Sequence, residues 1–162
     1  AQKDALTGVY NRENTQKLID TILREKDPKG FHGFLILDMD HFKEVNDVYG
    51  HVMGDNVLKM LGSFLKEQFR EQDVIGRIGG DEFVILLCNI GSRENMESRI
   101  KNLHEKLREI HMEGMEEYTF SFSAGIAFAP QDGDTFMELY QKADLALYQV
   151  KRSGRNGYRI YK

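Results

Sequence analysis

Two carboxylates, Asp38 and Asp40, end a run of apolar residues at positions 34–37. A buried carboxylate without a partner is strongly destabilising, so acidic residues in this place need an explanation. Residues two apart on a strand face the same side, which would make Asp38 and Asp40 neighbours. Like charges this close repel unless a cation lies between them or one side chain turns outward. The alternative is a strand that ends in solvent, with Asp40 capping a helix at Phe42.

A second acidic pair, Asp81 and Glu82, follows two glycines. Gly79 and Gly80 separate two apolar runs and indicate a tight hairpin, because such turns need positive φ. Alone, this pattern is equally typical of a glycine-rich turn with solvated charges. In one sheet, however, a central strand and a hairpin can bring Asp38 close to both acidic residues. Three oxygen donors around one gap suit Mg²⁺, and that arrangement serves phosphoryl and nucleotidyl transfer.

Two basic residues, Lys151 and Arg155, lie four positions apart at the end of the last predicted helix. The simplest interpretation is a favourable interaction of positive charge with the helix dipole. Beside a site of metal and carboxylates, the same pair would also bind phosphate groups.

The elements that must hold these side chains alternate between helix and strand, with no linker between them. Helices and strands in this order, with a central hairpin, indicate an α/β sandwich built on a mixed sheet. Apolar spacing predicts helices over residues 12–24 (capped by Asn11), 42–49, 57–69, 96–110 and 135–152. Strands are predicted over residues 33–38, 74–87 with the glycine pair inside, 118–129 and 158–161.

Three of these segments carry more detailed expectations. Residues 27–30 predict a turn. In residues 118–129, apolar positions alternate with Ser121 and Ser123, which is the period of a strand. The apolar stripe over residues 96–110 covers about two heptads, which favours a helix packed on a sheet over a coiled coil.

Composition limits the classes of function. The 162 residues, 41% hydrophobic and 30% charged, fit one globular domain over residues 1–162. The single cysteine, Cys88, excludes a disulfide framework and a cysteine-based zinc site. A net charge of −4 argues against binding to DNA or other long nucleic acid. No apolar run approaches the roughly 20 residues of a membrane span, and we expect no direct membrane contact from this segment.

Six motifs, in order along the whole chain, resemble those of the GGDEF family of diguanylate cyclases. Residues 79–83 read Gly-Gly-Asp-Glu-Phe and give the family its name. The other motifs are D-x-L-T-G-x-x-N-R at residues 4–12, D-x-D-x-F-K-x-x-N-D at 38–47, G-H-x-x-G-D at 50–55, S-A-G-I-A at 123–127 and A-D-x-A-L-Y-x-x-K-x-x-G-R-N at 143–156.

This resemblance implies an α/β (α+β) sandwich with a ferredoxin-like βαββαβ core, similar to adenylyl cyclases and the polymerase palm, with helices flanking a mixed central sheet. It implies Mg²⁺-dependent condensation of two GTP into cyclic di-GMP and two pyrophosphates, by attack of a 3′-hydroxyl on an α-phosphate across a homodimer. Mn²⁺ is the alternative metal. We expect the chain to be the output domain of a longer bacterial protein, in the cytoplasm or as the cytoplasmic part of a membrane-anchored protein.

By the resemblance, the metal ligands are the carboxylates of Asp38 and Asp81 and the carbonyl of Met39, with Glu82 beside them as a further ligand and catalytic residue. Asp81 is also the base that takes the proton of the 3′-hydroxyl. Aspartate in place of glutamate there is a normal variant of the family. Because a metal lowers the pKa of a bound hydroxyl, a carboxylate of ordinary basicity could serve.

The resemblance also assigns residues that bind phosphates and product. Lys43 would stabilise charge on the triphosphate during catalysis, and Lys151 and Arg155 would hold it. Arg70 and Asp73 match the inhibitory product site, at which cyclic di-GMP binds. An R-x-x-D sequence by itself is more commonly a salt bridge at the surface.

Asn46 and Asp55 match the pair that reads guanine. A carboxylate can accept from both N1–H and N2–H₂ of guanine, whereas adenine has no donor at N1, so a site built on that pairing rejects the wrong base. Phe42 and His51 lie in the same stretch and are expected at the substrate. For His51 a purely structural role is the alternative.

Two alternatives to an active cyclase stay open. The first is a catalytically weak GGDEF domain that binds GTP or cyclic di-GMP as a regulatory module. The second is synthesis of a different cyclic dinucleotide. Asp55 disfavours that second alternative, because altered selectivity should change the residue that contacts guanine.

Overall fold

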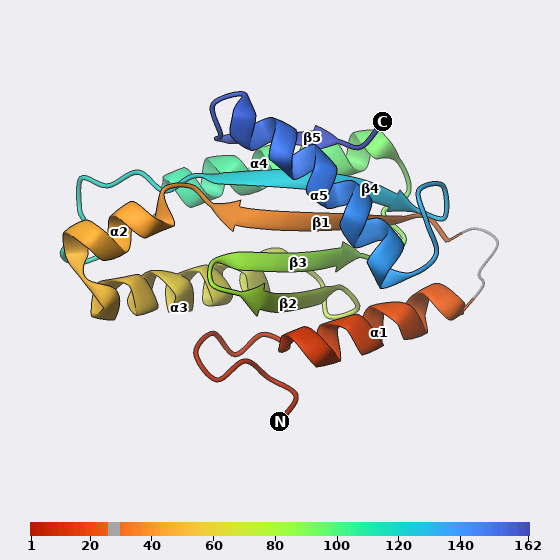
Figure 1. Cartoon of the computed structure of the whole chain (residues 1–162), viewed down its shortest axis with the longest axis horizontal. Coiled ribbons are helices and arrows are strands. Elements are labelled where there is room, and N and C mark those ends of the chain that lie inside the picture. The colour runs from red at the N-terminus through yellow and green to blue at the C-terminus, as the bar shows by residue number, and fades with distance from the viewer. Residues whose placement is uncertain (26–29) are drawn as a thin grey trace.

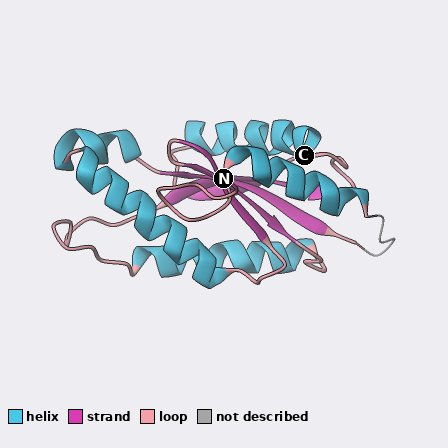
Figure 2. Cartoon of the chain, turned by 90° about the horizontal axis from the view of Figure 1, so that it is seen from below, coloured by secondary structure: helices cyan, strands magenta, loops and turns pink. Residues whose placement is uncertain are grey.

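A mixed sheet of five strands lies between two layers of helices in the computed structural model, which describes residues 1–25 and 30–162 (Figures 1 and 2). The strands are β1 (His32–Met39), β2 (Val74–Gly79), β3 (Glu82–Leu87), β4 (Phe122–Ala129) and β5 (Gly157–Ile160). The helices are α1 (Arg12–Arg24), α2 (Phe42–Tyr49), α3 (His51–Gln68), α4 (Arg93–Arg108) and α5 (Phe136–Arg152).

The strand order is β2-β3-β1-β4-β5, which places β1 at the centre and β5 at one edge. β1 is antiparallel to both of its neighbours, and β5 runs parallel to β4. The first four strands, with α3 and α4 as their connections, form the β-α-β-β-α-β arrangement of a ferredoxin-like core. The predicted fold class is therefore confirmed, with α1, α5 and β5 as additions to that core.

Helices cover both faces of the sheet, which explains why β1 is apolar on both sides. Side chains of α3 and α4 share one hydrophobic cluster with the sheet, and side chains of α1 and α5 share the other (Figure 2). The stripe of α4, from Met96 to Leu107, is buried in the first cluster, so the prediction of a helix packed on the sheet is confirmed. Among the described residues, no helix combines the length and the hydropathy that a membrane crossing requires.

The segment at residues 118–129 comes out differently from the expectation. The strand predicted over residues 118–129 begins only at Phe122, and β4 is buried along its whole length. Ser123 is fully buried rather than set apart from its apolar neighbours, because its hydroxyl donates to Asp40 Oδ1 at 2.6 Å. A turn is expected at residues 27–30, but positions 27–29 lie outside the described residues.

A glycine on β4 fixes how closely α5 approaches the sheet. A Cβ atom on Gly125 would lie 2.0 Å from the carbonyl oxygen of Ala143 and 2.6 Å from the amide nitrogen of Leu147. No side chain fits there, so α5 lies directly on the backbone of β4. This contact sets the position of the following turn of α5, which carries Lys151.

His104 of α4 is held as a neutral ring inside the layer between α4 and the sheet. Its ring stacks on Phe122, with 3.7 Å between centroids and 13° between planes, and its Nε2 is buried without a hydrogen-bond partner among the described residues. Burial lowers the pKa of His104 to about 4, although the charge of Asp40 acts in the opposite direction. As the pH falls, this histidine is therefore protonated in the unfolded chain at a higher pH than in the folded protein.

We predict that His104→Phe makes folding less sensitive to acid. The unfolded histidine binds a proton near its ordinary pKa of about 6.5, so the free energy of unfolding falls as the pH drops below that value and keeps falling to the folded pKa. Between pH 7.5 and 5.0 the variant should lose about 2 kcal/mol less than the wild type, as measured by urea unfolding. The exposed His111 offers the matched control, His111→Phe. Equal losses in all three proteins would contradict the prediction.

Candidate functional site

A cavity of about 390 Å³ lies where β1 ends and α2 begins, and it gathers most of the predicted site residues. They come from four separate parts of the chain, namely the end of β1, α2, the β2–β3 turn and the end of α5. The predicted residues that line it are Asp38, Met39, Phe42, Lys43, Asn46, Asp81, Lys151 and Arg155. His41 and Glu44 line it as well, and sequence reasoning missed both of them.

Strand register brings the acidic residues together. Asp38, near the end of β1, is the cross-strand partner of Glu82 at the start of β3. Asp81 lies in the turn just before Glu82, where Gly80 adopts a φ of 51°. Arg77 supports this turn from behind, because its Nε donates to the Gly80 carbonyl at 2.8 Å and its Nη1 pairs with Asp4 at 3.2 Å. The turn that carries Asp81 is thus tied to the N-terminal segment.

The two acidic residues of the hairpin have raised pKa values. Burial raises the pKa of Asp81, and the nearby charge of Asp38 raises it further. Burial also raises the pKa of Glu82, against a hydrogen bond from Tyr140, and the charges of Asp38 and Asp144 add to the rise. These carboxylates therefore repel one another, and a cation placed between them would be favoured.

Asp38 provides the sharpest indication of a cation site. Its Oδ2 accepts a hydrogen bond from Lys151 Nζ, whereas its Oδ1 is buried with no hydrogen-bond partner among the described residues. A carboxylate oxygen in that state is unfavourable unless a ligand supplies the missing interaction. Asp81 and Met39 line the same cavity, and the carboxylate and carbonyl oxygens that these residues carry are hard donors of the kind that fits Mg²⁺.

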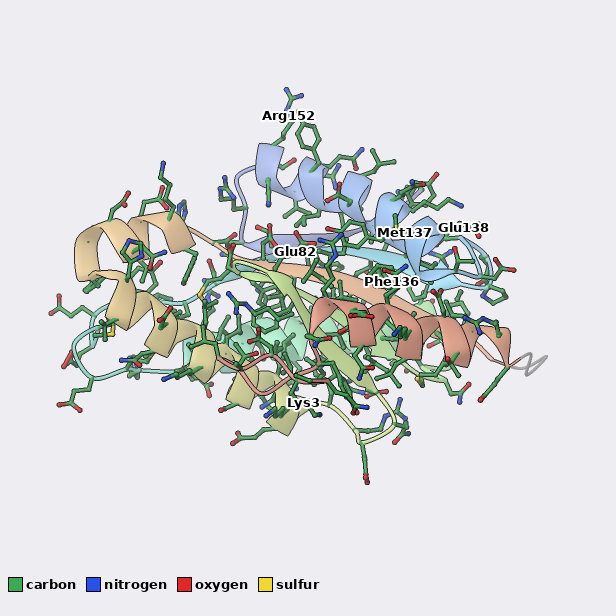
Figure 3. The ribbon with its side chains drawn as sticks, turned by 60° about the horizontal axis from the view of Figure 1, so that its bottom comes forward. Lys3, Glu82, Phe136, Met137, Glu138 and Arg152 are labelled. Atoms are coloured by element: carbon green, nitrogen blue, oxygen red, sulfur yellow. The ribbon has the colours of Figure 1, made fainter. Side chains whose placement is uncertain are left out.

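A metal-binding role for Glu82, the third carboxylate of the expected set, stays a prediction. Among residues 1–25 and 30–162, no three His, Cys, Asp or Glu side chains group closely enough to hold a metal ion by themselves. Glu82 is directed elsewhere, because its Oε1 accepts a hydrogen bond from the Tyr140 hydroxyl on α5. Figure 3 shows Glu82 on the side of the sheet that α5 covers. Of the three carboxylates in the expected set, Asp38 and Asp81 line the cavity.

Asp40 follows neither of the two expectations for it. The residue is 2% exposed, and its carboxylate accepts from the hydroxyls of Ser121 and Ser123, both at 2.6 Å, and from the Asn156 amide at 2.9 Å. It does not cap α2, whose N-cap is His41 in the left-handed conformation. Asp40 instead anchors the loop after α5, in which Arg155 also has positive φ. Its role is to position the loop that carries Arg155.

The residues expected to read guanine lie on α2 and α3. Asn46 packs against Gly54 so closely that a Cβ atom on this glycine would lie 1.8 Å from Asn46 Oδ1. Asp55 follows Gly54, and His51 begins α3, but both are exposed and neither lines the cavity. Asn46 is thus the member of this group that the structure brings next to the acidic residues.

Arg70 and Asp73 lie away from the cavity, next to the far end of β3. The Asp73 side chain is wholly buried and accepts from the backbone amides of Cys88 and Arg70, both at 3.0 Å. The Arg70 guanidinium pairs with Asp73 at 3.3 Å and donates to the Cys88 carbonyl at 2.5 Å, and 41% of its side chain is exposed. The pair is therefore more than a salt bridge at the surface, and product binding there stays a prediction.

Comparison with known proteins assigns this architecture. A sequence model of the family described as "Diguanylate cyclase, GGDEF domain" matches residues 1–157. The chain belongs to the GGDEF family. The acidic turn at residues 79–83 is the motif after which the family is named, and it lies on the hairpin that presents Asp81.

Curated relatives of this GGDEF domain are longer than it. It is 38% identical over 162 residues to a protein named diguanylate cyclase DgcS, from Shewanella oneidensis. That match covers 99% of this chain but 53% of DgcS. It is 34% identical over 161 residues to cyclic di-GMP phosphodiesterase PdeR, from Escherichia coli, of which the match covers 24%. The similarity is therefore to one part of each relative.

Solved structures share the whole fold. The GGDEF domain of TpbB, also called YfiN, from Pseudomonas aeruginosa superposes with a TM-score of 0.91 at 32% identity, covering 99% of this chain and 94% of that one. The GGDEF domain of DgcB from Caulobacter crescentus, solved in complex with c-di-GMP, superposes with a TM-score of 0.88 at 25% identity. The match covers 99% of this chain and 95% of that one.

We predict that Lys151→Met destabilises the metal-free domain. The substitution removes the cation that pairs with Asp38 and leaves a largely buried carboxylate beside Asp81. Urea unfolding in EDTA should show a loss of about 1 to 3 kcal/mol, and Mg²⁺ should restore more stability to the variant than to the wild type. The exposed Lys59, changed to Met, is the control. A Lys151 variant as stable as the control in EDTA would contradict the ion pair's role.

Proposed function

We propose that this GGDEF domain is a diguanylate cyclase. It joins two GTP molecules through two successive attacks of a 3′-hydroxyl on an α-phosphorus. Each attack forms one P–O bond, breaks the bond to the β-phosphate, and releases one pyrophosphate and one proton. The observation that carries the proposal is the unpartnered Oδ1 of Asp38, in a cavity that also holds Asp81 and the basic side chains of Lys151 and Arg155.

The residues of the cavity divide into groups with separate tasks. Asp38, Asp81 and the Met39 carbonyl would hold Mg²⁺, or Mn²⁺ in its place, which when bound supplies charge neutralisation at the phosphates and a lower pKa for the hydroxyl. Lys151 and Arg155 would hold the triphosphate. Lys43, exposed at the start of α2, would stabilise the charge that develops on it.

Asp81 is the base in this proposal. It lies at the tip of a hairpin, where it can face a second molecule of GTP bound by another copy of the chain. Its raised pKa makes it a somewhat stronger base than an ordinary aspartate. Glu82 accepts a hydrogen bond from Tyr140 and would act on the site through its charge rather than as a principal metal ligand.

A single cavity accommodates one triphosphate, so the reaction needs two copies of the chain that face each other. The assay follows from this requirement. Purified protein is incubated with GTP and Mg²⁺ over a range of protein concentrations, and the nucleotides are separated. Turnover per molecule should rise with protein concentration, and a fused dimerising segment should abolish that dependence. Failure to form cyclic di-GMP at any concentration, with the dimeriser present, would refute the proposal.

Asp81→Asn should reduce turnover at least a hundredfold, because the amide cannot take the proton and is a poorer ligand for a metal. The side chain lies at a turn, and the change relieves repulsion with Asp38, so we expect the thermal stability in EDTA to be retained or raised. Circular dichroism measures that stability alongside the assay. Asp47→Asn, at an exposed position of α2, is the control. Cyclase activity close to the wild-type level in Asp81→Asn would overturn the assignment.

Gly54→Ala should weaken nucleotide binding while leaving the stability of the fold nearly unchanged. Alanine favours a helix by about 1 kcal/mol over glycine, but its Cβ would displace the Asn46 side chain from its present position. We expect GTP affinity to fall at least tenfold in calorimetry, while the change in melting temperature stays small. Gly50→Ala is unsuitable as a control because Gly50 has positive φ, so Ser63→Ala, exposed on α3, is used instead. Unchanged affinity for GTP would show that Asn46 does not contact the base.

The second candidate is a regulatory module that binds GTP or cyclic di-GMP without turnover. The similarity to PdeR favours it, since this relative carries the name of a phosphodiesterase. Tight nucleotide binding with no product in the assay above would support it. The cytoplasmic location and product binding at Arg70 and Asp73 are parts of the proposal that the cyclase assay does not address.

A further inference from the structure

A second hollow, away from the proposed active site, lies along the outer edge of β5. It has a volume of about 1210 Å³. Its walls are the second half of α5 on one side and Glu97 of α4 on the other, with β5 and the residues after it between them. We call it the edge groove; its lining residues include Leu145, Tyr148, Arg152, Tyr158, Ile160 and Lys162.

The backbone at the floor of the edge groove has unused hydrogen-bonding groups. Within the described part of the chain, β5 pairs only with β4. The Tyr161 amide donates to the Ile126 carbonyl of β4 at 2.8 Å. Because the direction of backbone groups alternates along a strand, the N–H and C=O groups of Tyr158 and Ile160 point away from β4. They offer an extended chain the donors and acceptors of a further strand.

The wall formed by α5 is apolar at its middle. Leu145 is 59% exposed and Tyr148 is 58% exposed, although both are large apolar side chains. They line the edge groove next to Ile160 of β5. Single exposed apolar residues are common, but two of them beside a free strand edge form a surface on which side chains of an added strand can pack.

Positive charge lies at both ends of the edge groove. Arg152 ends α5, and Lys162 follows β5 at the C-terminal end of the strand (Figure 1). Arg152 points away from the rest of the molecule in Figure 3. Arg159 adds a third cation, whereas the only acidic side chain of the lining, Glu97, accepts a hydrogen bond from the Tyr158 hydroxyl at 2.9 Å. This basic region stands out on a chain whose net charge is −4.

We propose that the edge groove binds an extended segment of a partner protein, with an apolar centre and acidic ends, as a sixth strand beside β5. This inference does not depend on the cyclase activity. Charge selects the partner over a second copy of this chain, since two copies paired through β5 would bring their arginine and lysine side chains together. Basic residues on an edge strand that merely prevent aggregation are the rival explanation, and they predict no binding.

The probe is a capped heptapeptide with a Val-Tyr-Val centre and two glutamates on either side, labelled with fluorescein. Its counterpart has lysine in place of every glutamate. Fluorescence polarisation should show binding of the acidic peptide to the 162-residue chain at least tenfold tighter than that of the basic one. Hydrogen exchange followed by NMR should show the amides of Tyr158 and Ile160 slowed on binding, and the amide of Arg159, which faces β4, unchanged.

Two pairs of variants test the wall and the charge. Leu145→Asp should weaken binding of the acidic peptide at least fivefold, whereas Met137→Asp, on the same helix outside the groove, should not. Arg159→Glu should also weaken binding of the acidic peptide at least fivefold, whereas its control on α4, Arg108→Glu, should not. All four positions are exposed or half-exposed, so the variants are expected to fold.

In the peptide experiments, any of three results overturns the proposal. The acidic peptide fails to bind at millimolar concentration, both peptides bind equally well, or the slowed amides lie outside β5. Protection of Tyr158 and Ile160 in the protein alone, lost together with a dimer in Leu145→Asp, would overturn it in favour of pairing between copies of this chain.

Discussion

Electrostatic repulsion at the buried ends of β1 and β3 is the constraint on which the rest of the site depends. Register sets Asp38 against Glu82, and the hairpin adds Asp81, so the charge of Asp38 acts on two further carboxylates that are partly buried and raises the pKa of both. The chain relieves this repulsion in two ways, with Lys151 on Asp38 and Tyr140 on Glu82. Both partners come from α5. One oxygen of Asp38 remains without a hydrogen-bond partner among the described residues, and a bound cation would supply the missing interaction.

The packing of α5 is therefore as much a part of the site as the acidic motif. Gly125 allows the helix to lie on β4, and this contact determines the positions of the Tyr140 and Lys151 side chains. Beyond the helix, Asp40 holds the Asn156 amide and so fixes the loop that carries Arg155. A carboxylate that resembles a metal ligand in the sequence thus acts as an anchor, with its charge satisfied by two hydroxyls and one amide.

Sequence patterns predicted the elements and the location of the site, because both depend on local spacing. The apolar runs, Asn11 as a helix cap and the glycine pair of the hairpin all act within a few residues. The patterns could not predict the orientation of Asp40 or Glu82, since their partners Ser123 and Tyr140 are 83 and 58 positions away along the chain. The alternation in residues 118–129 misled for a related reason, because a polar serine can be buried when a distant carboxylate accepts a hydrogen bond from its hydroxyl.

Charge balance within the cavity bears on the proposed metal ions independently of any motif. Its lining carries three basic side chains, Lys43, Lys151 and Arg155, and three acidic ones, Asp38, Glu44 and Asp81, so the charges cancel. A nucleoside triphosphate near neutral pH brings about four further negative charges, which the protein alone does not offset. Two divalent cations would match that excess. In the proposed reaction, the carboxylates of Asp38 and Asp81, which repel one another, are thus the groups that would hold the cations beside the triphosphate. A cavity with neutral residues at these two positions would bind the anion with its charge uncompensated.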